Sequence, residues 1–290
     1  MARILLTGVS TLDIINTVDN YPPEDSEVRA IEQATRTGGN ACNSAKVLQQ
    51  LDIHTSLLAN YADDVSASYI LNDLKQQNID VSHCPVEKNS TTPTSYITIN
   101  RQNGSRTIVH YRNLQELSAS DFTRLNLNVF DWLHFEARNC DQLEKMLQHA
   151  SLLNSKISIE VEKPRKNINA IFKYANVLLI SRPYAESQNF SSAEHCLKDL
   201  SSKFPDKIIT CSWGSDGAWA YTGEKIIYQP AFPVEHPIET LGAGDTFNAG
   251  FIAAQMKQHN VTESLAFACE LASNKCQQTN LTQLLIPNLN

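Results

Sequence analysis

The chain has 290 residues, of which 42% are hydrophobic and 19% charged, a balance that is ordinary for a globular enzyme with a sizeable core. Its formal net charge of −7 argues against a nucleic-acid partner or an anionic membrane surface, because either would need a basic stripe. No apolar run approaches the ~18 residues that a membrane-spanning helix requires.

The N-terminal segment and the cysteines predict a cytoplasmic location. The apolar run within residues 1–8 is too short for a signal peptide and is soon followed by Asp13. The seven cysteines are odd in number and include no Cys-x-x-Cys pair, which is typical of reduced, mostly buried thiols. No histidines stand at the spacing of metal ligands, so we expect no structural zinc.

Short apolar runs alternate with helical patterns along most of the chain. Runs of this kind suit strands that are covered on both faces, and they occur at residues 4–7, 55–58, 132–135, 157–161, 177–180 and 208–211. Helical patterns lie between several of them, at residues 43–51, 67–77, 143–153 and 193–200. The alternation predicts an α/β fold with a mainly parallel sheet and helices on both faces.

Two stretches interrupt this alternation and predict a small β-sheet lid. Both are rich in β-branched and aromatic residues, and the second contains two such runs on either side of Asn103-Gly104, which predicts a hairpin with an Asn-Gly turn. The sequence shows no repeats and no clear linker. We therefore expect one domain over residues 1–290, with a lid built from about 12–37 and 94–112.

The most informative motif begins a late helix. Gly242, Ala243 and Gly244 precede the apolar helical pattern 247–256, and backbone N–H groups at a helix start suit an anion. Asp245 follows at once, where a carboxylate could take the proton of a hydroxyl that attacks a bound phosphoryl group. An acidic residue there also stabilises a helix without any chemistry, but the Thr-Phe-Asn-Ala-Gly that follows makes the motif more specific.

A second glycine cluster lies near the N-terminus and also begins a helix. Asn40 and Asn43 follow Gly38-Gly39, and their spacing places two amide groups on one helix face, where they could bind a polyol. Helix capping is the alternative, credible for Asn40 and poor for Asn43. Asp13, just after the first strand, could bind two sugar hydroxyls or be an ordinary loop acid.

The two motifs together resemble the paired signature of the ribokinase-like (PfkB) carbohydrate kinases. Within that superfamily the chain is most similar to the ketohexokinase group, and the similarity extends over most of its length. The matching segments are residues 12–13, 21–22, 24–27, 104–108, 136, 138–139, 161–165, 231–233 and 240–248.

The resemblance implies a three-layer α/β core with a β-sheet lid, ATP and Mg²⁺ as cofactors, and a sugar held between core and lid. It implies that Asp245 is the general base and that the N–H groups of Gly242, Ala243 and Gly244 form an anion hole. The substrate-binding residues it implies are Asp13, Gly39, Asn40, Asn43, Arg106 and Arg138. For the two arginines, ion pairs at the protein surface are an equally good explanation. On the ATP side it implies Trp213, Gly214, Phe232, Pro233, Gly242, Gly244 and Cys276.

The resemblance also implies a homodimer through the lids, with Asp25 reaching the sugar of the neighbouring protomer. Three departures bear on the cofactors. The superfamily's Asn-x-x-Glu, which helps to organise Mg²⁺, falls at residues 181–184, where neither residue occurs, so the metal ligands stay unassigned. Glu239 stands where the family usually has Asp near a monovalent-cation site, which leaves K⁺ activation open. Residues 277–283 do not show the expected glycine.

The preferred hypothesis is an ATP:ketohexose kinase that converts D-fructose to fructose 1-phosphate. One alternative is a PfkB kinase for another sugar or a nucleoside; the Glu, Asp, Ser and Arg side chains of the predicted lid favour a polyol over a nucleoside. Another alternative is a non-catalytic sugar-sensing protein, for which a base beside an anion hole would have no use.

Overall fold

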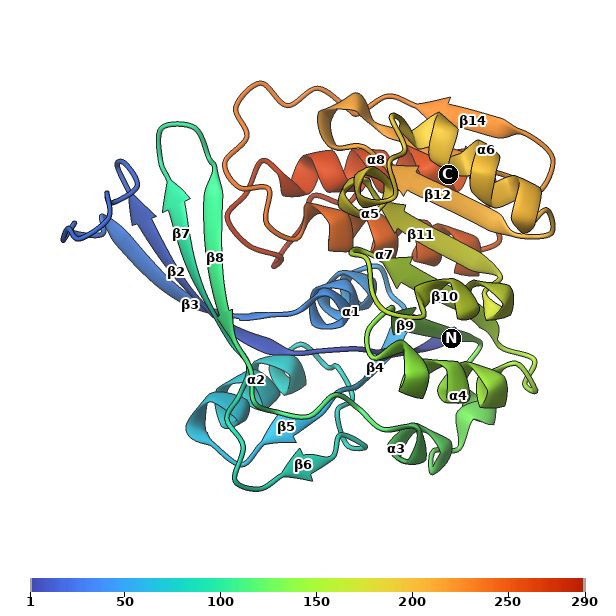
Figure 1. Cartoon of the computed structure of the whole chain (residues 1–290), viewed down its shortest axis with the longest axis horizontal. Helices are drawn as coiled ribbons and strands as arrows, with labels where there is room; N and C mark the ends of the chain where they lie inside the picture. Colours follow the sequence, from blue (N-terminus) through green and yellow to red (C-terminus); the bar gives the residue numbers. More distant parts are fainter. Residues whose placement is uncertain (1, 289–290) are drawn as a thin grey trace.

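The computed structural model describes residues 2–288 and is built around an eight-stranded sheet (Figure 1). The six predicted strands are confirmed and pair in parallel, and a final antiparallel hairpin extends one edge of the sheet. In spatial order the strands are β14 (Ile226–Gln229), β13 (Ala218–Tyr221), β12 (Ile208–Ser212), β11 (Val177–Ser181), β10 (Lys156–Val161), β9 (Trp132–Glu136), β1 (Arg3–Thr7) and β4 (His54–Leu58).

Helices cover both faces of this sheet and create two hydrophobic cores. In β1, Ile4 and Leu6 pack into one core and Leu5 into the other, as the alternation of side chains along a strand requires. The first core is completed by α1 (Asn40–Gln50), α2 (Val65–Gln76), α7 (Ala243–Met256) and α8 (Val261–Lys275). The second is completed by α3 (Ala119–Thr123), α4 (Cys140–Ala150), α5 (Arg182–Ser187) and α6 (Ala193–Lys203).

The predicted helices are all present, with ends that differ by a few residues from the predicted ones. Short 3₁₀ helices occur at Leu127–Val129, Ile168–Ala170, Phe172–Tyr174 and Gly214–Asp216, and a minor two-stranded sheet pairs β5 (Tyr61–Ala62) with β6 (Val86–Glu87). Within residues 2–288 no helix combines the length and the apolar character needed to cross a membrane.

A separate four-stranded sheet, here called the lid sheet, projects from the body of the molecule (Figure 1). Its strands, in spatial order, are β3 (Glu32–Gly38), β2 (Thr11–Val18), β7 (Thr94–Asn100) and β8 (Arg106–Tyr111). The predicted hairpin is β7–β8, but its connection spans residues 101–105, so the predicted Asn-Gly turn is wrong in length. Gly104 does take a positive φ of 68° in this longer loop, which explains the glycine.

Candidate active site

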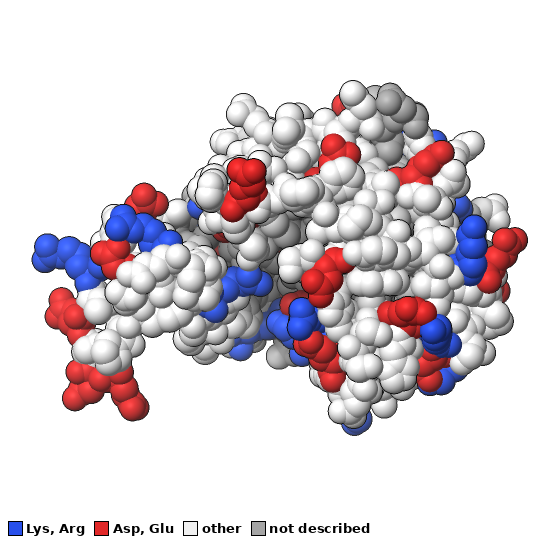
Figure 2. All heavy atoms as spheres, turned by 90° about the horizontal axis from the view of Figure 1, so that it is seen from above, with Lys and Arg blue, Asp and Glu red and all other residues white. Residues whose placement is uncertain are grey.

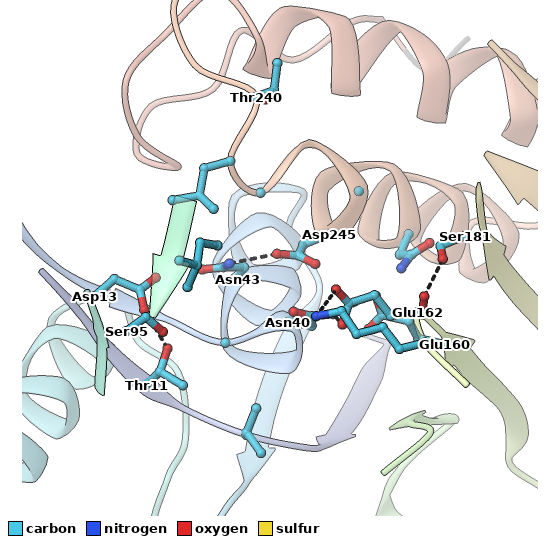
Figure 3. Close-up of a pocket in the computed structure, with 18 of the residues that line it drawn as sticks. Thr11, Asp13, Asn40, Asn43, Ser95, Glu160, Glu162, Ser181, Thr240 and Asp245 are labelled. Atoms are coloured by element: carbon cyan, nitrogen blue, oxygen red, sulfur yellow. Dashed lines mark hydrogen bonds and ion pairs between the residues drawn. The ribbon is translucent and has the colours of Figure 1, made fainter. Parts of the chain in front are cut away.

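A cavity of about 370 Å³ lies between the lid sheet, the start of α1 and the start of α7 (Figure 3). The carboxyl ends of the parallel strands β10, β11 and β12 form its floor through Glu160, Ser181 and Ser212, which is where open α/β sheets bind ligands. The space-filling view shows the hollow between the lid sheet and the body (Figure 2). Residues of the predicted site that line this cavity are Asp13, Gly39, Asn40, Asn43, Arg106, Arg138, Gly242, Gly244 and Asp245.

Asp245 lies in the first turn of α7 and is held by α1, which packs beside it. The Asn43 amide donates a hydrogen bond of 2.7 Å from Nδ2 to Asp245 Oδ2, and the Ser44 hydroxyl donates to the Asp245 carbonyl at 3.2 Å. Burial raises the pKa of Asp245 to about 7; the Asn43 hydrogen bond lowers it, and the nearby carboxylates of Glu162 and Glu136 raise it further. The group is thus a carboxyl that changes charge near neutral pH.

The backbone just before Asp245 opens toward the cavity. Gly242 precedes α7 with a φ of 81°, and a side chain added at Gly244 would meet open space. The N–H of Ala243 donates to the Thr240 carbonyl at 3.2 Å, whereas the N–H groups of Gly244 and Asp245 have no acceptor among residues 2–288. Ala243 therefore does not offer the free N–H that the sequence predicted, and the available donors among the described residues are those of Gly242, Gly244 and Asp245.

Asp13 enters the cavity from the lid sheet, opposite Asp245 in Figure 3. Its Oδ1 accepts a hydrogen bond of 2.9 Å from the Thr11 hydroxyl, and burial raises its pKa while hydrogen bonds from Thr11 and Ser95 lower it. A Cβ at Gly38 would collide with the Asp13 carboxylate, so a larger residue there would displace this carboxylate from its position. The side chain is positioned to accept hydrogen bonds from a ligand in the cavity.

Both predicted asparagines bind carboxylates of the protein itself. Asn43 holds Asp245, and the Asn40 Nδ2 donates to Glu160 Oε1 at 3.1 Å and to Glu162 Oε2 at 3.3 Å. Asn40 is not the residue that caps α1, because that position is Gly39, whose φ is 100°. The alternative that Asn40 caps the helix is therefore wrong. The amides of Asn40 and Asn43 instead hold the carboxylates on the acidic side of the cavity in position.

The two predicted arginines line the cavity and also make contacts within the protein. Arg106, on β8, donates from its guanidinium to the Thr240 hydroxyl at 2.9 Å and so joins the lid sheet to the segment before α7. Arg138 Nε donates to Glu116 Oε1 at 3.2 Å and lies 4.0 Å from Glu136 Oε2. Arg138 thus forms ion pairs within the protein and also lines the cavity.

Sequence reasoning missed the carboxylates at the end of β10. Glu160 is buried, and its Oε2 atom has no hydrogen-bond partner in the described part of the chain. Burial, and then the neighbouring carboxylates of Asp245, Glu136 and Glu162, raise its pKa well above the ordinary value. The signal was present as two glutamates, Glu160 and Glu162, two residues apart at the end of a predicted strand. Other polar side chains of the cavity were also missed, among them Ser95, His110 and Lys163.

The remaining predicted residues lie outside the described lining of this cavity. Asp25 is exposed in the connection between β2 and β3. Trp213 follows β12, with the Arg182 guanidinium 5.3 Å from its ring centre. Cys276 ends α8, and its carbonyl accepts the N–H of Ile238. The rest of this set is Gly214, which begins a 3₁₀ helix, and Phe232 and Pro233, which lie between β14 and α7. Their ATP-side roles stay predictions, as does that of Asp25.

Comparisons with known proteins agree with this geometry. The family model described as "pfkB family carbohydrate kinase" matches residues 1–288. Ketohexokinase of Mus musculus is 37% identical over 285 residues, which cover 94% of this chain and 96% of that protein. An ATP-dependent ribose-1-phosphate kinase of Halopiger xanaduensis is 24% identical over 92% of this chain and 90% of its own length.

Solved structures show the same fold at lower sequence identity. The ribokinase of Arabidopsis thaliana, complexed with ribose and ATP, has a TM-score of 0.81 and 18% identity, covering 98% of this chain and 96% of its own. A match over nearly the whole chain, together with the two glycine-led helix starts that meet at one cavity, assigns this protein to a family: it belongs to the pfkB carbohydrate kinases, which are ATP-dependent sugar phosphotransferases.

Proposed function

We propose that this kinase transfers the γ-phosphate of ATP to a hydroxyl of a ketohexose, with D-fructose as acceptor and fructose 1-phosphate as product. The observation that carries the proposal is the Asp245 carboxylate, held by Asn43 beside the free N–H groups at the start of α7. The acceptor class is supported by the 37% identity to mouse ketohexokinase, which exceeds that of the ribose-1-phosphate kinase.

In this mechanism Asp245 takes the proton of the attacking hydroxyl. A pKa of about 7 suits a general base at neutral pH, because a substantial fraction is ionised and the ionised form still binds a proton well. The Asn43 amide fixes the orientation of the carboxylate, and the N–H groups of Gly244 and Asp245 stabilise negative charge on the transferring phosphoryl group. Arg106 would add positive charge from the lid sheet.

The polar walls of the cavity suit a polyol. The lid sheet contributes Asp13, Ser95 and His110 to the lining, and Asp13 and Ser95 are positioned to bind hydroxyl groups. A nucleoside acceptor would need a broad apolar or aromatic surface for its base, whereas the lid sheet contributes only Ile97 and Ile108 of that kind. This supports a sugar over a nucleoside.

Glu160 and Glu162 are the residues that would hold Mg²⁺. No group of three or more His, Cys, Asp or Glu side chains within residues 2–288 is arranged to bind a metal by itself. Mg²⁺ bound with nucleotide needs only one or two carboxylates, since phosphates and waters complete its shell, and the unpartnered Oε2 of Glu160 fits that requirement. When bound, the ion would neutralise phosphate charge. Ser181, at the first position of the expected Asn-x-x-Glu, instead caps α5.

The nucleotide and the second protomer complete the proposal. ATP would extend from α7 toward Trp213, Gly214, Phe232, Pro233 and Cys276. The lid sheet leaves Tyr96, Val109 and Tyr111 exposed, and such side chains support a homodimer through the lids that carries Asp25 to the partner's sugar. The proposed enzyme is a cytoplasmic, single-domain kinase of residues 1–290, whose lid excludes water when sugar is bound.

The proposal is tested by an assay that couples ADP release to an optical signal, run with ketoses, aldoses, sugar phosphates and nucleosides. We expect D-fructose to give the highest kcat/KM and the product to be fructose 1-phosphate by NMR. A higher kcat/KM for an aldose, a sugar phosphate or a nucleoside would overturn the acceptor assignment. Sugar binding without ATP consumption would revive the sensor hypothesis.

A further inference from the structure

A fully buried lysine lies behind the proposed phosphate site. Lys275, the last residue of α8, has a relative exposure of 0%. Its Nζ lies 3.1 Å from the Gln278 carbonyl, 3.3 Å from the Glu239 carbonyl and 3.8 Å from Glu239 Oε1. The two carbonyls accept hydrogen bonds and the carboxylate lies at ion-pair distance, which suits a charged ammonium group and not the lone pair of a neutral amine. Burial lowers the pKa of Lys275, and the Glu239 carboxylate opposes that effect.

The acceptors around this ammonium come from two separate segments. One precedes α7 and contributes the carbonyl and carboxylate of Glu239, and the other follows α8 and contributes the carbonyl of Gln278. Arg36 of β3 donates to both oxygens of the same carboxylate, at 3.0 and 2.8 Å, and to the Thr279 carbonyl. Converging carbonyl and carboxylate oxygens are typical of sites for free cations, yet here the positive charges are side chains of the protein.

The segment held by Lys275 leads directly into the start of α7. The N–H groups of Ile238 and Glu239 both donate to the Cys276 carbonyl, and the Thr240 carbonyl accepts the N–H of Ala243. Gly242, with its positive φ, follows two residues after Thr240. A shift of Glu239 would therefore move the N–H groups that we assign to the phosphoryl group.

We propose that Lys275 is a positioning residue that acts as a tethered monovalent cation: its ammonium joins residue 239 to residue 278 and fixes the start of α7, so that phosphoryl transfer needs no free monovalent cation. The inference rests on the proposed function, since it takes the start of α7 as the phosphate site.

The structure provides a direct way to test this by chemical rescue. A second cavity of about 220 Å³ is lined by Arg36, Glu239 and Lys275. Truncation of Lys275 would open space beside this cavity, where a small cation could contact the same acceptor oxygens and draw the two segments back together.

The experiment measures kcat of the full-length Lys275→Ala enzyme with tetramethylammonium as the only monovalent cation, and then with K⁺, NH₄⁺ or methylammonium added. We expect a loss of at least about tenfold, because displacing site groups by 1 Å can cost about 10²-fold. Small cations should restore much of it in a saturable way, whereas wild-type kcat should be the same with and without K⁺. Lys275→Met, which fills the hole with an uncharged chain, should be slow and not rescued.

Lys207 offers a matched control. It is another buried lysine, 7% exposed, whose Nζ donates to the carbonyls of Ala175 and Lys173 at 2.8 and 3.1 Å, away from both cavities. Lys207→Ala should lower the melting temperature and leave kcat and its cation response unchanged. Stimulation of the wild type by K⁺, an unimpaired or unrescued Lys275→Ala enzyme, or equal rescue of Lys275→Met would each overturn the proposal.

Thermal melting separates this inference from the proposed mechanism. A cation that binds the folded Lys275→Ala protein should raise its melting temperature progressively as its concentration increases above Kd, with no such response in the wild type or in Lys207→Ala. If the melting temperature of Lys275→Ala responds to the cation while Asp245→Asn keeps normal turnover, the role of Lys275 as a tethered cation is supported. The assignment of the start of α7 as the phosphate site is then rejected. If that response is missing, the tethered cation falls whatever Asp245 does.

Discussion

The helices α1 and α7 begin with similar glycine-led sequences, but their first N–H groups have different fates. At α1, the buried carboxylate of Glu136 accepts the N–H of Ala41 at 2.5 Å and of Val9 at 3.3 Å. At α7, the N–H groups of Gly244 and Asp245, two residues that line the cavity, have no acceptor in the described chain. A glycine at a helix start thus indicates an unusual backbone conformation. An anion site results only where no other group of the protein accepts the first N–H groups of the helix.

The carboxylates near the two helix starts, Glu136 at α1 and Asp245 at α7, differ in whether they can reach a ligand in the cavity. Burial raises the pKa of Glu136 to about 7, as it does for Asp245. Glu136 is not among the residues that line the cavity, and its Oε1 accepts hydrogen bonds from two backbone N–H groups. We therefore assign it a structural role. Asp245 receives one hydrogen bond from Asn43 and otherwise faces the cavity, so it is free to exchange a proton with a ligand.

The largest expected effect comes from removing the carboxylate at α7. Asp245→Asn keeps the size and polarity of the side chain but removes the base, and we expect kcat to fall by about 10²–10⁴. Sugar binding, measured by calorimetry, should change little because the rest of the cavity is intact. Near-normal turnover would remove Asp245 from the mechanism.

The corresponding change at α1 should affect stability rather than turnover. Glu136→Ala leaves the N–H groups of Ala41 and Val9 without their acceptor, at a cost of about 1–3 kcal/mol each. Urea unfolding should show this loss, with kcat within a few-fold of the wild type near room temperature. Glu136→Gln, which keeps an acceptor oxygen, is the matched control and should lose less. A loss of kcat as large as that of Asp245→Asn would contradict the division between the two helix starts.

Sequence reasoning identified both helix starts but could not tell them apart. It found the strands, because buried parallel strands are continuous apolar runs. It found Asn43 and Asp245 because they lie in motifs, whereas Asp13 was singled out by its place after the first strand and by the family resemblance. It missed Glu136 as the acceptor at α1 and Glu160 in the cavity. Both stand at the carboxyl ends of neighbouring strands, and their roles depend on the pairing of β9 with β10, a contact that local patterns do not specify.

The two glycines before the helices should also differ in their tolerance of a side chain. Gly39 has a φ of 100° and a ψ of 137°, and a Cβ there would collide with the Val9 carbonyl. Gly242 is left-handed, and its Cβ would lie 3.3 Å from Leu281 Cδ1, a flexible neighbour. We expect Gly242→Ala to cost about 1–2 kcal/mol and Gly39→Ala about 3 kcal/mol, measured by chemical unfolding. Equal losses would show that the backbone at α1 can adjust.

The last expected effect is the pH dependence of stability, to which the buried carboxyls of Asp245 and Glu136 contribute. Their pKa values are about 7 in the folded chain, against ordinary values of 3.8 for Asp245 and 4.5 for Glu136. The folded chain therefore binds more protons than the unfolded chain between these limits, and stability falls as the pH rises through this window. The melting temperature without ligands should be several degrees lower at pH 7.5 than at pH 5.5.

Glu136→Gln and Asp245→Asn, which cannot ionise, should each reduce this slope, because each removes one group whose proton is held more tightly in the folded state. A melting temperature that rises over the same interval, or variants that keep the wild-type slope, would mean that these carboxyls are already ionised at pH 5.5, and Asp245 would then lack the near-neutral pKa that suits it as the base.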